Sequence, residues 1–206
     1  MVAVSSKDVW KAYGVWAFWV GVAFFAVYPT CNWLSSQRTH ALTLYLESEL
    51  SVPFVPEFVW VYVSMYVLFL TPPFVLDVSR LKVLGKQLVA ATLVSGVVFL
   101  LLPAKLGFTR TAPKDPFYGS FFTHLFAVDL PYNMVPSLHV VFSALFLFAV
   151  LDASSTLLAK SFLWGWLILL CTSTLLVHQH HLLDVIAGLA IVLLTRRRIR
   201  NGGDYA

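Results

Sequence analysis

Charged residues are scarce in this sequence. Asp, Glu, Lys and Arg together make up 12% of its 206 residues, whereas 59% are hydrophobic. Several segments therefore lack enough polar surface to face water along their whole length, which excludes an ordinary soluble domain and indicates an integral membrane protein. The sequence also lacks internal repeats and low-complexity tracts. No nucleic-acid partner is expected, and the oligomeric state is left open.

Cysteine is nearly absent as well. Cys31 falls near the end of the first apolar run and Cys171 falls inside the fifth, so we expect neither a disulfide nor a metal site from them. The first apolar run also lacks an Ala-x-Ala-like cleavage site after Tyr28. We therefore expect that run to be retained as a membrane anchor rather than removed as a signal peptide.

Apolar runs recur along the chain at lengths close to those of membrane-crossing helices. A helix needs about 20 apolar residues to cross a hydrocarbon core of roughly 30 Å. The candidate runs lie at about 9–28, 57–76, 84–102, 136–152, 161–177 and 181–195. The expected fold is all-α, a polytopic membrane protein with one six-transmembrane-helix bundle over residues 1–200. Residues 201–206 are expected to form a disordered tail.

Positive charges are divided unequally between the two ends of these runs. If the N-terminus is cytoplasmic, ten Lys and Arg side chains fall on the inner side and four on the outer side. The positive-inside rule then predicts that both termini are cytoplasmic. The same assignment places every histidine at or beyond the outer ends of the runs: His40, His124, His139, His178, His180 and His181.

A first polar cluster opens the sixth run. Asp184 follows His180 by four residues, so the carboxylate can hold the imidazole in one orientation and tautomer on a helix. His181 stands three residues before the same aspartate, which is also a permitted helical pair, so spacing alone does not select one imidazole. We expect His178 and His181 to be structural or to line a substrate.

A second polar cluster stands where the fourth run begins. Pro136 and Ser137 precede His139 in what should be the first turn of a helix, where unpaired N–H groups favour an anion such as phosphate. His139 can donate a proton to a leaving oxygen, and the Ser137 hydroxyl can bind a phosphate oxygen. Lys105 and Arg110 can supply the positive charge that phosphoryl transfer requires. The two clusters together provide the groups for metal-free phosphoryl transfer.

These residues carry a resemblance to a known family. Pro-Ser-Leu-His at 136–139, and Ser-Thr at 173–174 followed by His180 and Asp184, resemble two motifs of the phosphatidic acid phosphatase type 2 superfamily. Those motifs are usually Pro-Ser-Gly-His and Ser-Arg-x5-His-x3-Asp. The resemblance implies a six-helix membrane fold with His139 as general acid, His180 as nucleophile and Asp184 as the group that orients His180. It implies no cofactor.

The sequence departs from the usual motifs at three places. Thr174 replaces an arginine, Leu138 replaces a glycine, and Lys105-x4-Arg110 replaces the usual Lys-x6-Arg-Pro. Leu138 and the absence of that arginine resemble the branch that contains inositol phosphorylceramide synthase, whose members pass a phosphoryl head group to another alcohol. The resemblance therefore leaves two reactions, hydrolysis of a lipid phosphate or pyrophosphate and transfer of a lipid head group, of which we favour hydrolysis.

A third hypothesis belongs to another class, in which the histidine cluster binds a metal or serves transport. The apolar runs hold almost no polar residue at mid-membrane depth, which disfavours a conduction path. On any of these hypotheses the site faces the noncytoplasmic side.

Three further expectations concern the outer side. Residues 41–47 form either a short amphipathic helix or a plain connector. Residues 103–135, the longest polar segment, form a solvated loop. Glu57, Tyr62 and Tyr66 either face the interior or form an aromatic belt at the membrane surface, and we favour the belt.

Overall fold

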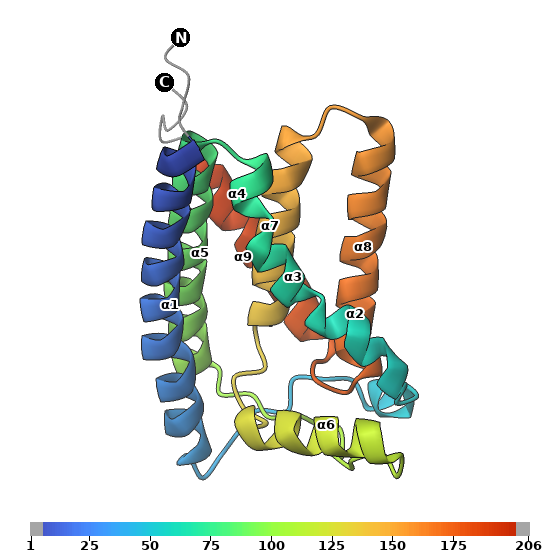
Figure 1. Cartoon of the computed structure of the whole chain (residues 1–206). Coiled ribbons are helices and arrows are strands. Elements are labelled where there is room, and N and C mark those ends of the chain that lie inside the picture. The colour runs from blue at the N-terminus through green and yellow to red at the C-terminus, as the bar shows by residue number, and fades with distance from the viewer. Residues whose placement is uncertain (1–5, 201–206) are drawn as a thin grey trace.

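The structure, a computed structural model, describes residues 6–200 (Figure 1). Over this range the chain is all-α and has no strand, only an isolated bridge between Leu42 and Ala104. The all-α prediction is therefore confirmed. The predicted tail at 201–206 lies outside the described residues.

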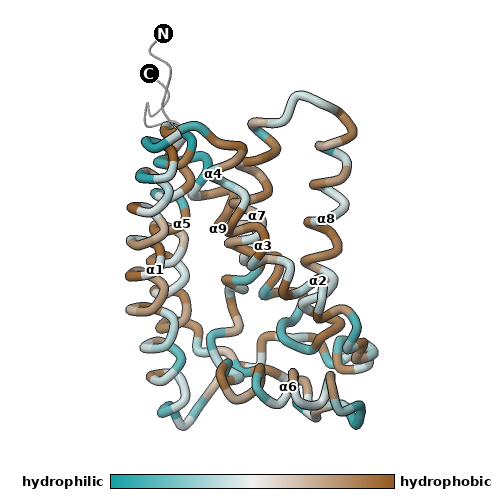
Figure 2. The backbone as a smooth tube through the Cα atoms, in the orientation of Figure 1, coloured by the Kyte–Doolittle hydropathy of each residue, from teal (hydrophilic) through white to brown (hydrophobic). Residues whose placement is uncertain are grey.

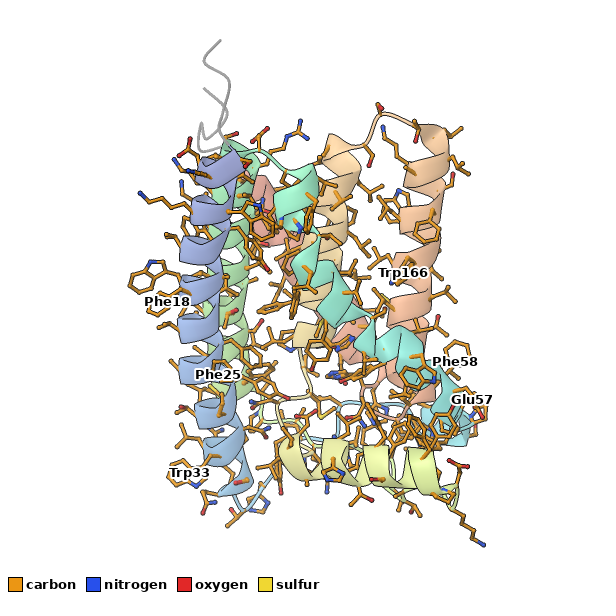
Figure 3. The ribbon with its side chains drawn as sticks, viewed as in Figure 1. Phe18, Phe25, Trp33, Glu57, Phe58 and Trp166 are labelled. Atoms are coloured by element: carbon orange, nitrogen blue, oxygen red, sulfur yellow. The ribbon has the colours of Figure 1, made fainter. Side chains whose placement is uncertain are left out.

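Three long helices have the length and composition of membrane spans. They are α1 (Ser6–Ser36), α5 (Val78–Leu101) and α8 (Leu157–Leu176), the only described helices that meet both conditions. Large apolar side chains such as Phe18 and Trp33 point away from the bundle, as Figure 3 shows, and are 63% and 59% exposed. Exposed apolar surface of this kind suits contact with lipid rather than water.

Two further helices complete the long elements of the bundle. The apolar helix α7 (Leu138–Ala153) is shorter than a full span, and most of its residues are buried. Helix α9 (Leu182–Arg200) ends in a cationic run that begins at Arg196. Hydrophilic residues gather toward the two ends of the bundle in Figure 2, whereas apolar ones dominate between them.

The second predicted span is not one continuous helix. Its residues divide into η2 (Pro56–Phe58), α2 (Val59–Val63), α3 (Met65–Leu70) and α4 (Pro72–Val75), which cross the bundle obliquely in Figure 1. The Ser64 and Thr71 hydroxyls donate to carbonyl groups three residues earlier, at 2.5 and 2.8 Å. These bonds compete with the helix ladder, and Pro72 has no N–H to continue it. The structure therefore does not confirm one helix over residues 57–76, and the pair Pro72-Pro73, which interrupts this run in the sequence, marks one of its breaks.

The outer loops hold one unpredicted helix. Helix α6 (Pro116–Val128) lies across the end of the bundle in Figure 1, within the segment expected to be a loop. The Asp115 carboxylate caps it by accepting from the N–H groups of Phe117 and Tyr118 at 3.0 and 2.9 Å. Residues 41–46 contain no helix, and the 3-10 helix η1 spans Glu47–Ser51, so the plain-connector alternative is the better one.

The bundle has chemically different ends. Arg196 of α9 pairs with Asp152 of α7 at 2.9 Å, and Arg80 at the start of α5 lines the same small cavity. His139 lies near the opposite end of α7 and His180 just before α9. Cationic groups thus collect at one end of the bundle and the histidine cluster at the other.

Candidate active site

The turn between α8 and α9 places His180. His178 adopts a left-handed backbone conformation (φ 53°), and the Thr174 carbonyl accepts from the N–H groups of Gln179 and His180, each at 3.0 Å. These bonds satisfy a free carbonyl at the end of α8. The Thr174 hydroxyl donates to the Cys171 carbonyl at 2.8 Å. Thr174 therefore serves the turn with both its backbone and its side chain.

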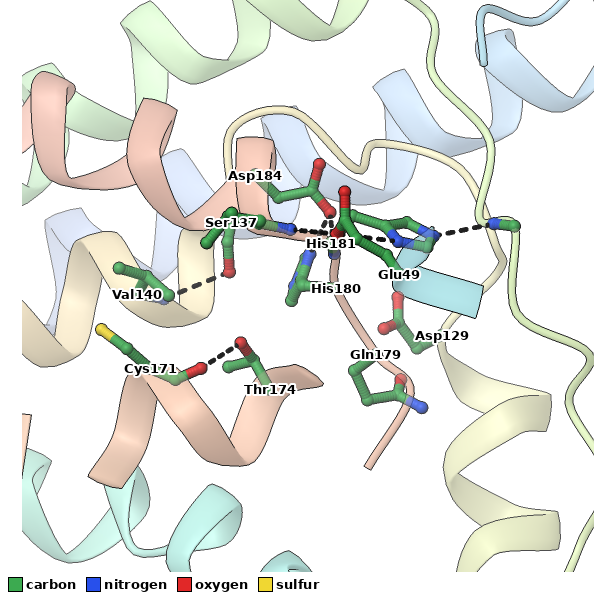
Figure 4. Close-up of polar contacts among 12 residues, drawn as sticks. Glu49, Asp129, Ser137, Val140, Cys171, Thr174, Gln179, His180, His181 and Asp184 are labelled. Carbon is green, nitrogen blue, oxygen red and sulfur yellow. Dashed lines mark hydrogen bonds and ion pairs between the residues drawn. The ribbon is translucent and has the colours of Figure 1, made fainter. Parts of the chain in front are cut away.

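His180 and Asp184 form a buried pair (Figure 4). The distance from His180 Nδ1 to Asp184 Oδ2 is 3.2 Å, and the same oxygen accepts from the His181 N–H at 2.7 Å. Because a carboxylate only accepts, Nδ1 must carry the proton in this bond. In the neutral imidazole the other nitrogen of His180, Nε2, then has a free lone pair and can act as a nucleophile. The predicted i, i+4 geometry is present.

The start of α7 is held against α9. The Ser137 N–H donates to the Asp184 carbonyl at 3.0 Å, and the Ser137 hydroxyl caps α7 by accepting from the Val140 N–H at 3.3 Å. A Cβ at Gly188 would lie 3.0 Å from the Ser137 carbonyl oxygen, a tight contact, so glycine here allows the two helices to approach closely. The two predicted clusters therefore lie in direct backbone contact.

His139 and His180 line one cavity. The His139 ring stacks on Tyr62 with centroids 3.9 Å apart and planes at 11°, and its Nε2 is buried without a hydrogen-bond partner. Tyr62 is buried, so its assignment to an aromatic belt is wrong, whereas Tyr66 is 59% exposed as a belt residue would be. Tyr62 is thus a site residue that sequence reasoning placed elsewhere.

The cavity is large and mostly apolar. Its volume is about 720 Å³, and its walls come mainly from aromatic and aliphatic side chains of α1, α3, α5 and α7. The polar groups gather at one end, where Asp129 joins His139 and His180. An apolar chamber with a few convergent polar groups is the usual form of a small-molecule site, and this one suits a lipid with a polar head.

Arg110 is linked to the polar end of the cavity through Asp129 and Gln179. Its guanidinium donates to the Asp129 carbonyl and, at 3.3 Å, to Gln179 Oε1, while the Asp129 carboxylate lies 4.0 Å away. Nε is buried without a partner, and the Phe126 ring lies 5.3 Å away. Burial lowers the pKa of Arg110 and Asp129 opposes that shift, so the group stays cationic. The Asp129 carboxylate also accepts from the Tyr28 hydroxyl at 2.5 Å.

Lys105 is not brought into this group. Its side chain is exposed, and its backbone N–H bonds to the Leu42 carbonyl at 3.1 Å as part of the contact between the two outer loops. Of the three predicted phosphate ligands, the structure therefore places Ser137 and Arg110 near the histidines and leaves Lys105 at the surface.

His181 differs from its neighbour because the outer loops surround its ring, although its Nδ1 is buried without a hydrogen-bond partner. Nε2 accepts from the Gly107 N–H at 3.0 Å, and Nδ1 lies 3.4 Å from the Glu49 carboxylate. The ring lies between those of Tyr45 and Phe108, each with its centroid 4.4 Å away. His181 does not line the cavity. His181 therefore anchors the outer loops. Of the two imidazoles near Asp184, His180 is the one that faces the cavity.

Glu49 is a second residue that sequence reasoning missed. Its carboxylate accepts from the Leu182 N–H at 2.7 Å, at the start of α9, and from the Leu46 N–H at 2.9 Å. Burial raises the pKa of Glu49, but these two hydrogen bonds and the nearby His181 outweigh it and leave the pKa below its usual value. The cap spans more than a hundred residues of sequence, so no local pattern announces it.

His178 anchors the same loop. Its Nε2 lies 2.9 Å from the Val52 carbonyl, and its ring stacks on Phe108 with centroids 3.9 Å apart. This position supports a structural role for His178. Within the described part of the chain, no three side chains of His, Cys, Asp or Glu gather in a group that could hold a metal ion. Cys31 and Cys171 are free thiols.

The fold and site together define a helical membrane protein with a His–Asp pair at the polar end of an apolar cavity. Comparison with family models gives a match to the PAP2 superfamily over residues 32–196, which contains every candidate site residue. The chain therefore belongs to that superfamily, and membership supports a phosphatase or phosphotransferase type of function. No curated protein and no solved structure matches the chain.

Proposed function

We propose that this protein is an integral membrane lipid phosphatase, which removes phosphate from a lipid phosphate or pyrophosphate through a phosphohistidine intermediate. The observation that carries the proposal is the His180–Asp184 pair, 3.2 Å apart, beside His139 at the polar end of a large apolar cavity. A lipid tail fits the apolar part, and its phosphate then meets the histidines.

In the first step, Nε2 of His180 attacks phosphorus and the bond to the lipid oxygen breaks. Asp184 accepts the hydrogen bond from Nδ1–H and balances the charge that develops on the imidazole. His139 donates a proton to the leaving group, which is the lipid alcohol for a phosphate and the lipid monophosphate for a pyrophosphate. In the second step, His139 takes a proton from water, whose oxygen attacks the phosphohistidine and releases phosphate.

The negative charge on the transferred phosphoryl group is stabilised best by hydrogen-bond donors that are already in position. Arg110 is the principal cation of the proposed site, because it is buried and its Nε has no partner. The Ser137 hydroxyl and the free N–H groups at the start of α7 add neutral donors. We assign Lys105 only a supplementary role near the entrance, because its side chain is exposed.

The proposed membrane placement has six crossings, with α2 to α4 together forming the second. Both termini are then cytoplasmic and the histidine cluster faces the noncytoplasmic side. The separation of Arg80 and Arg196 from the histidines, at opposite ends of the bundle, supports this orientation through the positive-inside rule.

Head-group transfer is the second candidate, and Thr174 favours it. The Thr174 hydroxyl is occupied with Cys171, so nothing at this position replaces the bidentate phosphate ligand that an arginine would supply. Transfer uses the same nucleophile, but the phosphohistidine keeps the head group on phosphorus and the acceptor is an alcohol instead of water. The inositol phosphorylceramide synthase type is the branch that this alternative resembles.

One experiment separates these reactions. Purified protein is incubated with a panel of lipid phosphates, with and without alcohol acceptors and with and without a chelator. We expect free phosphate, insensitivity to chelation, and a loss of about 10³-fold or more in His180→Ala. His124→Ala is the matched control, because His124 is exposed on α6. A new phosphate ester of the added alcohol would favour transfer, and loss of activity on chelation would favour a metal site.

A further inference from the structure

His139 lacks the kind of support that holds His180. The Asp184 carboxylate fixes the His180 ring through Nδ1, at 3.2 Å. Among the described residues no carboxylate pairs with the His139 ring, and its buried Nε2 has no hydrogen-bond partner. A general acid must nevertheless hold one ring nitrogen toward the leaving oxygen. The orientation of His139 therefore depends on a contact of another kind.

Tyr62 provides that contact. Its ring lies face to face with the His139 ring, with planes 11° apart and centroids 3.9 Å apart, and both side chains are buried. A neighbour stacked in this way fixes the plane of the imidazole. Stacking also uses only the face of the ring, so Nε2 at its edge stays free to donate a proton.

Tyr62 is itself held by contacts outside the catalytic groups. It packs in one apolar cluster with Phe122 of α6 and Val177, which follows the end of α8. Two residues further along the chain, the Ser64 hydroxyl accepts from Trp166 Nε1 of α8 at 3.2 Å, which ties the end of α2 to that helix. The ring of Tyr62 is therefore a fixed platform for a second ring.

The stack also suits the protonated state of His139. The cavity beside it is mostly apolar, and a buried charge without compensation is costly. His180 and Asp129 also line this end of the cavity, but neither bonds to His139 Nε2. A cation within about 6 Å of an aromatic ring is attracted by the negative face of that ring. The face of Tyr62 thus offsets part of the cost of a proton on His139.

We propose that Tyr62 is the positioning residue of the general acid: its ring fixes the plane of the His139 imidazole and stabilises the protonated form that donates to the leaving group. This inference rests on the proposed function and deepens it, because it adds the group that keeps His139 ready for proton transfer. The aromatic ring carries this role, so phenylalanine should replace tyrosine.

Two substitutions separate the ring of Tyr62 from its hydroxyl group. Tyr62→Phe keeps the stacked ring, whereas Tyr62→Leu removes it and retains an apolar side chain. Trp60→Leu is the matched control, because Trp60 is an aromatic residue of the same helix that is 54% exposed and does not line the cavity. Each variant is assayed with a long-chain alkyl phosphate and with a nitrophenyl phosphate that carries an alkyl chain.

The two substrates differ in their need for a general acid, because an alkoxide leaves poorly without a proton whereas nitrophenolate leaves readily without one. We expect Tyr62→Leu to lower kcat by about 10²-fold for the alkyl phosphate, with little change in KM, and by only about threefold for the nitrophenyl phosphate. Tyr62→Phe and Trp60→Leu should stay within about threefold of wild type with both substrates.

His139→Ala provides the reference pattern, because it removes the general acid itself and should show the same contrast between the substrates. Three results would overturn the proposal: equal losses with the two substrates in Tyr62→Leu, no loss in that variant, or a loss in Tyr62→Phe as large as in Tyr62→Leu. Equal losses would show that Tyr62 supports the fold or substrate binding rather than proton transfer.

A second readout does not depend on turnover. In the NMR spectrum of the protein in detergent, the stacked Tyr62 ring should shift the His139 ring protons upfield, and comparison with His139→Gln identifies those signals. The shift should persist in Tyr62→Phe and disappear in Tyr62→Leu, and its absence from wild type would contradict the inference. If the shift is present but wild-type protein hydrolyses neither substrate, the proposed function fails while the stacked pair stands.

Discussion

His180 and His181 show how neighbouring residues of one type acquire different roles. Both lie close to Asp184, and sequence spacing permits either as its partner. Nε2 of His181 accepts from Gly107, and Tyr45 and Phe108 enclose its ring, whereas His180 bonds through Nδ1 and lines the cavity. These surroundings distinguish the two imidazoles, which the spacing alone did not, and they are the reason that the proposed mechanism uses His180.

The candidate site was partly predictable at this scale. The spacing of His180 and Asp184 and the position of His139 could be taken from the sequence, because helical periodicity places such residues. Tyr62 and Glu49 could not, because each contacts the site from a distant segment without a local pattern. Lys105 and Arg110 lie five residues apart in an irregular loop, so periodicity could not separate the buried cation from the exposed one.

Arg110 carries the first prediction. We expect Arg110→Ala to lower kcat/KM by about 10²-fold, because the transition state loses its principal buried cation. Arg110→Lys should recover only part of that loss, since an ammonium group cannot reproduce a planar bidentate contact. Steady-state kinetics with one lipid phosphate measure both variants.

Lys105→Ala is the comparison for that prediction. An exposed lysine near the entrance should contribute a much smaller effect, which weakens as salt rises. Equal losses in Arg110→Ala and Lys105→Ala would contradict the assignment of Arg110 as the principal phosphate ligand.

At the scale of elements, the connector between α1 and the broken second span organises the outer end of the bundle. Glu49 on this connector caps α9, and the backbone of Val52 is held by His178. The first residues of α9 are therefore stabilised by a segment that composition presents as a simple loop. The connector thus helps to fix the position of Asp184, which lies in the first turn of α9.

Glu49 provides the second prediction. Its pKa is lowered in the folded protein, so its ionised form stabilises the fold above the unfolded pKa of about 4.3, and that contribution is lost as pH falls through the folded pKa. We expect Glu49→Gln to lower stability at neutral pH by about 1–2 kcal/mol, measured by thermal unfolding in detergent. The difference from wild type should shrink in acid.

Glu47→Gln is the control for Glu49. Glu47 lies two residues away and is exposed, so its replacement should leave the unfolding temperature within error of wild type at every pH. A constant deficit for Glu49→Gln at all pH values would show that the stabilising effect does not come from its ionised carboxylate.

The second span shows why helix boundaries escaped prediction. Its apolar composition suggested one crossing helix, but the Ser64 and Thr71 hydroxyls bond to the backbone and Pro72 interrupts the ladder. In a bilayer such breaks must be compensated by neighbouring helices, and α7 and α8 pack against these short segments. Ser64, Thr71 and Pro72 mark the breaks in this span, whereas its hydropathy alone does not show them.

At the scale of the whole molecule, the proposed topology makes the third prediction. In a background without Cys31 and Cys171, an impermeant thiol reagent should label Ser48→Cys and Ser120→Cys in intact cells. Ser79→Cys and Ser155→Cys should react only after permeabilisation. All four serines are exposed, which makes them accessible reporters. Labelling of Ser79→Cys or Ser155→Cys in intact cells, or protection of Ser48→Cys or Ser120→Cys, would contradict six crossings with cytoplasmic termini.

The composition was sufficient to predict the structural class of the whole molecule, because few charged residues and long apolar runs indicate a helical membrane protein. It did not predict the long cavity, because a cavity depends on how α1, α3, α5 and α7 are arranged around it. Helix α6 was missed for a related reason, since it lies across the end of the bundle within a polar segment.

The central claim is that His180 becomes phosphorylated during turnover. Protein incubated with a lipid phosphate labelled on phosphorus should be quenched rapidly and digested, and the label should be found on His180 as an acid-labile, alkali-stable adduct. His180→Ala should carry no label, and His181→Ala, if folded, should still be labelled on His180. Label on His181, or rapid turnover without any labelled histidine, would contradict the account.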